Sequence, residues 1–189
     1  NEFKNFDAFI KSIDARSGTI GMTSRYDNSK IVLIKLLLQE VLPKSIRTNI
    51  CDKLFKKYVS PEIESFAKNL YMNISQVKEI RKLGHEIGMH GYEHVRLGKL
   101  SKKEQLNDIM KAHKFLKENG LIDNKFTICY PYGNYNSDTL KILSNINCLI
   151  GVTTKPSPIP KKNYIALELP RLDTNDFPQR ENEINDKIH

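Results

Sequence analysis

Three of the five histidines in this chain lie within ten residues of one another, in the segment GHEIGMHGYEH over residues 84–94. His90 and His94 stand four positions apart, so their imidazole rings can converge on one metal ion if the chain turns between them. A catalytic zinc site has about three protein ligands and one position left open for water or substrate. The segment therefore predicts part of a divalent metal site, with two ligands visible.

A histidine pair at this spacing is weak evidence by itself, because many histidines are part-buried packing residues. The glycines at 84, 88 and 91 strengthen the prediction. Glycine lets the backbone leave a strand sharply, and β/α folds present their functional groups at strand ends. By contrast, His113 falls on the apolar face of a predicted helix with no second ligand beside it in sequence. We expect His113 to be a packing residue.

The first half of the chain carries apolar residues at intervals of three and four, which is the pattern of amphipathic helices. Stretches of this kind cover residues 31–42, 46–58, 63–70 and 73–84. Pro43 and Ser60 mark breaks between them, because proline ends a helix and serine favours the position before one. We expect residues 1–83 to form a helical insertion or appendage.

From Gly84 onward, short apolar runs alternate with helical stretches, which is the pattern of β/α units. Ser101 and Glu104 form a capping box that predicts the start of a helix. The predicted strands lie at residues 86–90, 126–130, 149–153 and 164–169. We expect residues 84–178 to form an α/β domain and residues 179–189 to form a polar tail.

A second distinctive segment, ICYPYGNYN over residues 128–136, starts in a predicted strand and continues into a turn. Proline followed closely by glycine and asparagine is typical of a tight turn. Together, this segment and the histidine segment resemble the third and second motifs of the carbohydrate esterase 4 polysaccharide deacetylases, which contain the nodulation-type deacetylase domain.

The resemblance implies roles for individual residues. In the family, the last two histidines of the second motif ligate the metal, which assigns this role to His90 and His94. The residue after the first ligand is usually Ser or Thr, whereas this chain has Gly91, which lacks a hydroxyl that could orient a ligand. The implied cofactor is a divalent metal, most readily zinc, with cobalt or nickel as alternatives.

The third motif forms one wall of the substrate groove in the family, which implies substrate contacts for Tyr130, Pro131 and Tyr132. The backbone N–H before the motif's glycine helps to hold the oxyanion, a catalytic role that maps onto Tyr132. The arginine usual near the start of this motif is absent, and Arg171 after the last predicted strand is the candidate to replace it. Asp173 is assigned to substrate binding, with an ordinary loop ion pair to Arg171 as the alternative.

The family's first motif, Thr-Phe-Asp-Asp-Gly, does not occur in this chain. In the family its two aspartates supply the general base and the third metal ligand, and neither FDA at residues 6–8 nor IDA at residues 13–15 reproduces it. We therefore expect an N-terminally truncated chain that folds as a partial, distorted (β/α) barrel with an N-terminal helical insertion. We expect this chain to be inactive by itself.

The resemblance implies a hydrolase that removes N- or O-acetyl groups from a bacterial surface polysaccharide or oligosaccharide, in the cytoplasm or at the cell envelope. One alternative is a glycan-binding protein of the same fold that has lost the chemistry. Another is a basic helical module that binds nucleic acid or an anionic membrane surface, because most of the net charge of +8 lies in residues 1–84.

Composition narrows these alternatives. The lysines are spread along predicted helices without aromatic residues between them, so we expect no nucleic-acid partner. No apolar run approaches the roughly 20 residues of a membrane span. Three widely spaced cysteines fit neither a disulfide framework nor a zinc knuckle. The deacetylase hypothesis therefore remains the one with residue-level support.

Overall fold

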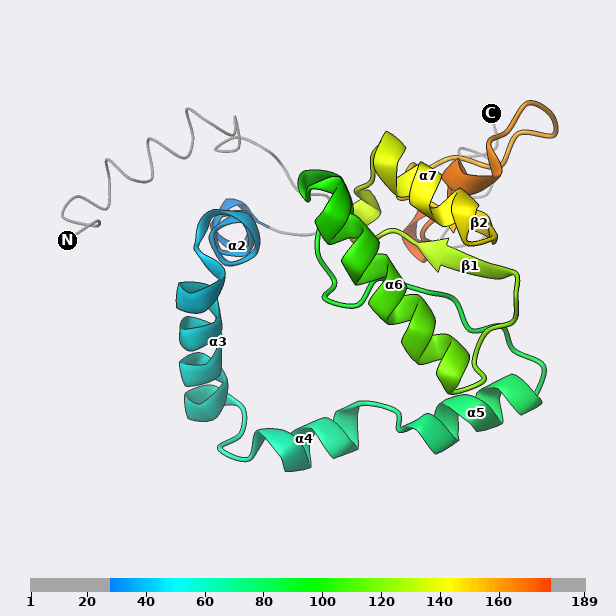
Figure 1. Ribbon diagram of the computed structural model, residues 1–189. Helices are drawn as coiled ribbons and strands as arrows, with labels where there is room; N and C mark the ends of the chain where they lie inside the picture. The colour runs from blue at the N-terminus through cyan, green and yellow to red at the C-terminus, as the bar shows by residue number, and fades with distance from the viewer. Residues whose placement is uncertain (1–27, 178–189) are drawn as a thin grey trace. The chain divides into compact units, whose positions relative to one another are not determined.

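The computed structural model describes residues 28–177 (Figure 1). They fall into two compact units, the first ending at Tyr71 and the second beginning at Met72. The predicted domain division at residues 83–84 stays a prediction. The predicted tail at 179–189 and the segments at 6–8 and 13–15 lie outside the described residues.

The described part of the first unit is helical, as the apolar spacing predicts. Asn28 caps its first helix by accepting a hydrogen bond from the backbone N–H of Ile31 at 3.1 Å. The rings of Phe55 and Phe66 meet edge to face at 5.1 Å between centroids and join the last two helices. The elements are α2 (Ser29–Leu36), a π-helical turn (Leu37–Val41), α3 (Lys44–Tyr58) and α4 (Ile63–Leu70).

Side-chain caps set the starts of the three helices in the second unit. The capping boxes predicted at Asn73 and at Ser101 are both confirmed, and Asn136 caps the third helix in the same way. These helices are α5 (Ile74–Lys82), α6 (Lys102–Glu118) and α7 (Ser137–Asn145). Single 3₁₀ turns lie at Leu97–Lys99, Pro131–Gly133, Ala166–Glu168 and Thr174–Asp176.

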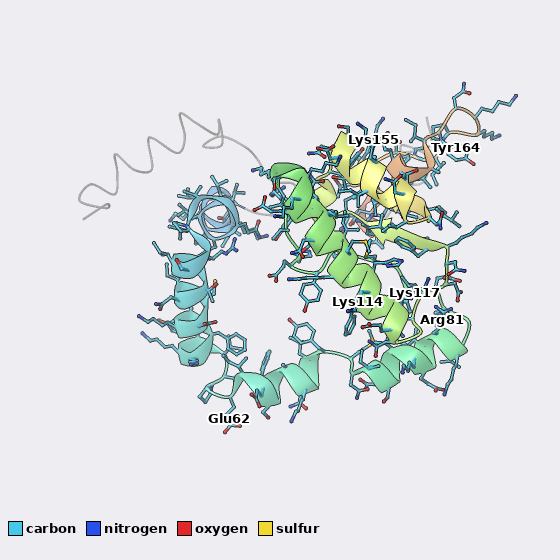
Figure 2. All side chains as sticks on the ribbon, viewed as in Figure 1. Glu62, Arg81, Lys114, Lys117, Lys155 and Tyr164 are labelled. Carbon is cyan, nitrogen blue, oxygen red and sulfur yellow. The ribbon has the colours of Figure 1, made fainter. Side chains whose placement is uncertain are left out.

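An arginine holds helix α5 to the rest of the second unit. The guanidinium of Arg81 donates to the carboxylate of Asp123 at 2.7 Å and also to the carbonyl oxygen of Leu121 (Figure 2). Both partners lie in the loop between α6 and the next strand. The last helix before the histidine segment is therefore tied to the same unit as that segment.

A short parallel sheet lies at the centre of the second unit. Strands β1 (Phe126–Cys129) and β2 (Cys148–Val152) pair in parallel and are connected through α7. Single bridges extend this pairing on both sides, from Met89 to Ile128 and from Val152 to Leu169. The described residues thus place four chain segments side by side, all running in one direction, which is the arrangement expected of successive β/α units.

The structure confirms two predicted strands and corrects two. Residues 86–90 form only the single bridge at Met89, and residues 164–169 form a 3₁₀ turn ending in the bridge at Leu169. Near this turn, the carbonyl of Leu167 accepts the Tyr130 hydroxyl at 2.7 Å. Residues 28–177 contain a two-stranded parallel sheet with a single bridge on each side, and the predicted partial barrel stays a prediction.

The core lies between the sheet and the helices α6 and α7 (Figure 1). Ile109 and Ala112 of α6 pack in one cluster with Phe126 and Ile128 of β1 and Leu143 of α7. Within the described range, no helix has the length and apolar character to cross a membrane.

One fully buried polar residue links the two helices. Gln105 of α6 accepts from the Thr139 hydroxyl of α7 at 2.6 Å and donates to the carbonyl of Leu100 at 3.0 Å. Because buried polar groups are costly unless hydrogen-bonded, these contacts fix how α6 lies against α7.

Candidate metal centre

His90 and His94 come together at the end of the segment bridged to β1. The Nε2 atoms of the two rings lie 3.1 Å apart, and the ring centroids are 4.8 Å apart. Nδ1 of His90 lies 2.7 Å from the carbonyl oxygen of Cys129 at the end of β1. When Nδ1 donates to that carbonyl, the lone pair on Nε2 is left to face His94. This is the arrangement that orients a metal-ligating histidine.

The two rings fit a single tetrahedral zinc ion. Two Nε2 atoms bound to one zinc at about 2.0–2.1 Å would stand roughly 3.3–3.4 Å apart, close to the observed separation.

Burial, followed by the charge of His90, lowers the pKa of His94 and favours the neutral imidazole that a metal requires. No third His, Cys, Asp or Glu joins the pair within residues 28–177. The described residues therefore bring two imidazoles together, and their role as metal ligands stays a prediction.

A buried aspartate on α6 shapes the turn between the two histidines. The carboxylate of Asp108, whose residue is 4% exposed, accepts the backbone N–H of Tyr92 at 3.0 Å and of Glu93 at 2.9 Å. The turn enters the left-handed region at Gly91 (φ +71°) and again at His94 (φ +51°). A Cβ atom on residue 91 would lie 3.1 Å from the Asp108 carboxylate. Glycine therefore suits this position, where the family usually has Ser or Thr.

Tyr132 lies beside the histidine pair, as its predicted role requires. Its ring centroid is 4.9 Å from that of His94, and its backbone has left-handed angles (φ 58°, ψ 16°) inside the turn Pro131–Gly133. The guanidinium carbon of Arg96 lies 4.4 Å from the centre of the Tyr132 ring. The catalytic role predicted for its backbone N–H stays a prediction.

Tyr130 and Pro131, predicted to contact substrate, are both buried. The Tyr130 ring is 2% exposed and stacks on Tyr135 at 4.4 Å between centroids. Burial, with smaller effects from neighbouring groups, raises the pKa of Tyr130 well above its ordinary value. Their burial argues for a packing role, and their contact with substrate remains a prediction.

The structure places Arg171 and Asp173 in the last part of the described chain. The Arg171 backbone N–H donates to the carbonyl of Lys155 at 2.9 Å, and its side chain is exposed. The Asp173 carboxylate caps the final 3₁₀ turn by accepting the N–H of Asn175 at 2.9 Å. The predicted catalytic role of Arg171 and the predicted substrate contact of Asp173 remain predictions.

An open hollow of about 520 Å³ adjoins the turn that carries Tyr132. Its lining includes Gly133 of that turn, Thr154 and Lys155 after β2, and Tyr164 and Glu168 farther along; Figure 2 labels Lys155 and Tyr164. Polar and aromatic groups thus surround a surface depression next to the site. This is the kind of surface that a sugar ring could occupy.

Sequence reasoning missed two residues of this site, Asp108 and Arg96. Asp108 could have been found, because it is an acidic residue on the otherwise core-facing side of a helix that includes Ile109 and Ala112. Buried carboxylates are rare unless they have hydrogen-bond partners. Arg96 had no comparable signal, because it stands in a polar loop and reaches Tyr132 only through tertiary contact.

His113 packs against the core instead of joining the site. Its ring lies 5.1 Å from that of Phe126, at an interplanar angle of 56°. Burial, with a smaller contribution from the charge of Lys117, lowers the pKa of His113. The prediction of a packing histidine is thus supported by its surroundings.

The lowered pKa of His113 predicts a pH-dependent part of the stability. Because the folded state disfavours protonation, its contribution is fully present above the ordinary pKa of about 6.5 and is lost as pH falls through the lower folded pKa. We expect His113→Gln to lose less free energy of unfolding than the unmodified chain between pH 7.5 and 5. Urea denaturation at several pH values measures this difference, and equal losses in both chains would contradict it.

Comparison with known proteins places this chain in a family. Residues 48–149 match the sequence profile of the family described as polysaccharide deacetylase. This range is more than half of the chain, so the chain belongs to the polysaccharide deacetylase family. The resemblance carried by the two sequence motifs is thereby confirmed.

Individual relatives agree with this assignment. The chain is 31% identical over 98 residues to a Bacillus subtilis protein named as a polysaccharide deacetylase, covering 49% of this chain and 33% of the relative. It is 33% identical over 101 residues to the peptidoglycan-N-acetylglucosamine deacetylase of Bacillus cereus, covering 53% and 36%. The matches span about a third of the length of these curated relatives.

A solved structure shows the same fold. The chain superposes on a Streptococcus pyogenes deacetylase in complex with acetate with a TM-score of 0.51 and 26% identity. The superposition covers 66% of this chain and 57% of the other. The superposed part of the chain therefore has the fold of a polysaccharide deacetylase, although the described strands form only a small parallel sheet.

Proposed function

We propose that this protein takes part in the metal-dependent removal of acetyl groups from a bacterial surface polysaccharide, with His90 and His94 as two of the metal ligands. The observation that carries the proposal is the 3.1 Å approach of their Nε2 atoms at a strand end beside the Tyr132 turn. Membership of the deacetylase family supports the reaction class, and a peptidoglycan deacetylase among the relatives supports the substrate class.

Each group around the pair has a distinct task in this proposal. A bound zinc, cobalt or nickel ion would polarise the acetyl carbonyl and lower the pKa of water. The Cys129 carbonyl orients the His90 ring through Nδ1 and keeps Nε2 directed toward His94. The Tyr132 ring lies beside His94, and in this proposal the backbone N–H of Tyr132, in its left-handed turn, would donate to the developing oxyanion.

The described residues leave two tasks unfilled. Within residues 28–177 no carboxylate joins the histidine pair as a third ligand, and the sequence contains no Asp-Asp pair. A hydrolytic reaction at this site also needs a general base to take a proton from water. We therefore propose that activity requires an aspartate motif beyond the 189 residues, and that this chain alone is inactive.

The absence of that motif also favours a second candidate, a glycan-binding protein of the same fold without chemistry. Such a protein would use the hollow beside Gly133 and the Tyr132 ring to bind sugar. The two candidates share the fold and differ in one measurable property, the release of acetate.

The deciding experiment measures acetate release from N-acetylglucosamine oligomers and from peptidoglycan. It uses a longer chain that carries an Asp-Asp motif ahead of residue 1, first treated with chelator and then titrated with zinc, cobalt or nickel. The proposal expects release that disappears with chelator and returns with metal. Glycan binding with no release under any metal would favour the second candidate.

A further inference from the structure

We infer that Asp108 is a positioning residue that holds His94 in register with His90. The inference rests on the proposed function of the histidine pair. Asp108 has no contact with either imidazole among the hydrogen bonds described, and it acts through the backbone between them, at Tyr92 and Glu93. Its two bonds of 3.0 and 2.9 Å involve both carboxylate oxygens and two successive amides.

The conformation of the turn explains why it needs an external support. Two of its residues, Gly91 and His94, have positive φ, and a non-glycine residue with positive φ is disfavoured unless its surroundings hold it. No helix or sheet hydrogen bond spans residues 91–94, because this stretch is irregular. The Asp108 carboxylate takes the place of regular backbone hydrogen bonding by accepting the N–H groups of Tyr92 and Glu93. We infer that these bonds set the direction of the His94 ring, which follows directly in the chain.

The support is rigid because the aspartate stands on an anchored helix. Asp108 is buried in the middle of α6, one turn after Gln105, which ties the same helix to α7. The turn is also confined from the other side, since a Cβ on residue 91 would lie 3.3 Å from the Pro131 ring. The position of the second predicted ligand is therefore determined by α6 and by the Tyr132 turn together.

A carboxylate suits this task better than an amide of the same shape. Each of its two oxygens accepts one N–H, whereas asparagine has one accepting oxygen and presents an NH₂ group to the second N–H. The change Asp108→Asn therefore removes one bond and sets two donors against each other with little change in volume. Asp108→Asn is therefore the variant that tests these hydrogen bonds with the least change in side-chain volume.

The experiment compares Asp108→Asn with Gln105→Ala in the 189-residue chain. Both changes remove buried hydrogen bonds from α6, but Gln105 contacts Leu100, Asn136 and Thr139 and no residue of the turn. Zinc affinity is measured by calorimetry, and stability by urea denaturation. We expect Asp108→Asn to weaken zinc binding by about 10- to 100-fold, as loss of an outer-shell partner does, while Gln105→Ala lowers stability and changes affinity less than about twofold.

A second measurement uses the metal-free, unmodified chain and needs no variant to fold. By hydrogen exchange, the amides of Tyr92 and Glu93 should be protected to the same degree as the amides in the middle of α6, because their acceptor is buried there. Exchange at the rate of open loop amides would overturn the inference. Unchanged zinc affinity in Asp108→Asn, or equal loss in both variants, would also overturn it.

The outcomes separate this inference from the proposed function. If the longer chain releases no acetate under any metal, the proposed function fails, and the protection of the Tyr92 and Glu93 amides still decides whether Asp108 holds the turn. If the chain binds zinc and Asp108→Asn binds equally well, only the inference fails.

Discussion

Replacing either His90 or His94 with alanine is expected to abolish zinc binding by the 189-residue chain. The unmodified chain should bind zinc measurably but weakly, because its described residues bring together two imidazoles where a catalytic site has about three protein ligands. Removing one of two ligands leaves a single imidazole, which holds zinc little better than a surface histidine. Since loss of an outer-shell partner alone costs about 10- to 100-fold in affinity, loss of a ligand should cost more than about 100-fold.

His113→Ala is the matched control for these variants. It removes an imidazole from the same unit, but one that packs on Phe126. Isothermal calorimetry on all three variants should show binding retained in His113→Ala and lost in the other two. Each variant should first be shown to be folded by its urea transition. An equal loss in His113→Ala would contradict the assignment of His90 and His94.

The pH dependence of zinc binding gives an independent test of the same site. Zinc binds neutral imidazole, and the pKa of His94 is lowered by burial and by the neighbouring His90. We therefore expect zinc affinity to fall as pH drops from about 6.5, the ordinary histidine pKa, through the lowered pKa of His94. An affinity that does not change between pH 7.5 and 5 would indicate ligands other than histidine.

The second large effect concerns activity. The 189-residue chain should release no acetate from chitin oligomers or acetylated glucosamine polymers, whereas a longer chain with an Asp-Asp motif ahead of residue 1 should release it when divalent metal is added. A positioned general base contributes roughly 10²–10⁴-fold to the rate. A missing third ligand also lowers metal occupancy, so the two defects multiply.

Two further experiments test why the 189-residue chain is expected to be inactive. His90→Ala in the longer chain should return the rate to that of the 189-residue chain, which would show that the longer chain uses this metal site. The 189-residue chain is tested separately for glycan binding, because the hollow beside Gly133 does not depend on the base. Full activity of the 189-residue chain would show that a base lies within it, and would overturn the proposal that this chain alone is inactive.

The sequence by itself was enough to locate the helices and the histidine pair. Local chemistry decides helix starts, and the capping boxes at Asn73 and Ser101 occur as predicted because each involves residues only three positions apart. The convergence of His90 and His94 was also predictable, since their spacing and the glycines around them act within one short segment. Family membership followed from the same segment and from residues 128–136.

The strands were less predictable, because a strand needs partners from distant parts of the chain. Residues 126–130 and 149–153 pair with each other and were found to within one residue at each end. Residues 164–169 alternate in the manner of a strand but form a 3₁₀ turn, next to which the Tyr130 hydroxyl bonds to the Leu167 carbonyl. Periodicity reports which side of a segment is apolar, and it does not report which neighbour is available to pair.

Only the tertiary structure decided what surrounds the histidine pair. Asp108 lies 14 positions from His94 in sequence, and its carboxylate reaches the turn only because α6 packs beneath it. Arg96 and Tyr132 are likewise distant in sequence and meet as a cation and a ring. The chemical identity of a ligand is a local property that spacing can reveal. Its orientation depends on contacts between separate elements, whose free energy is gained only when the chain has folded.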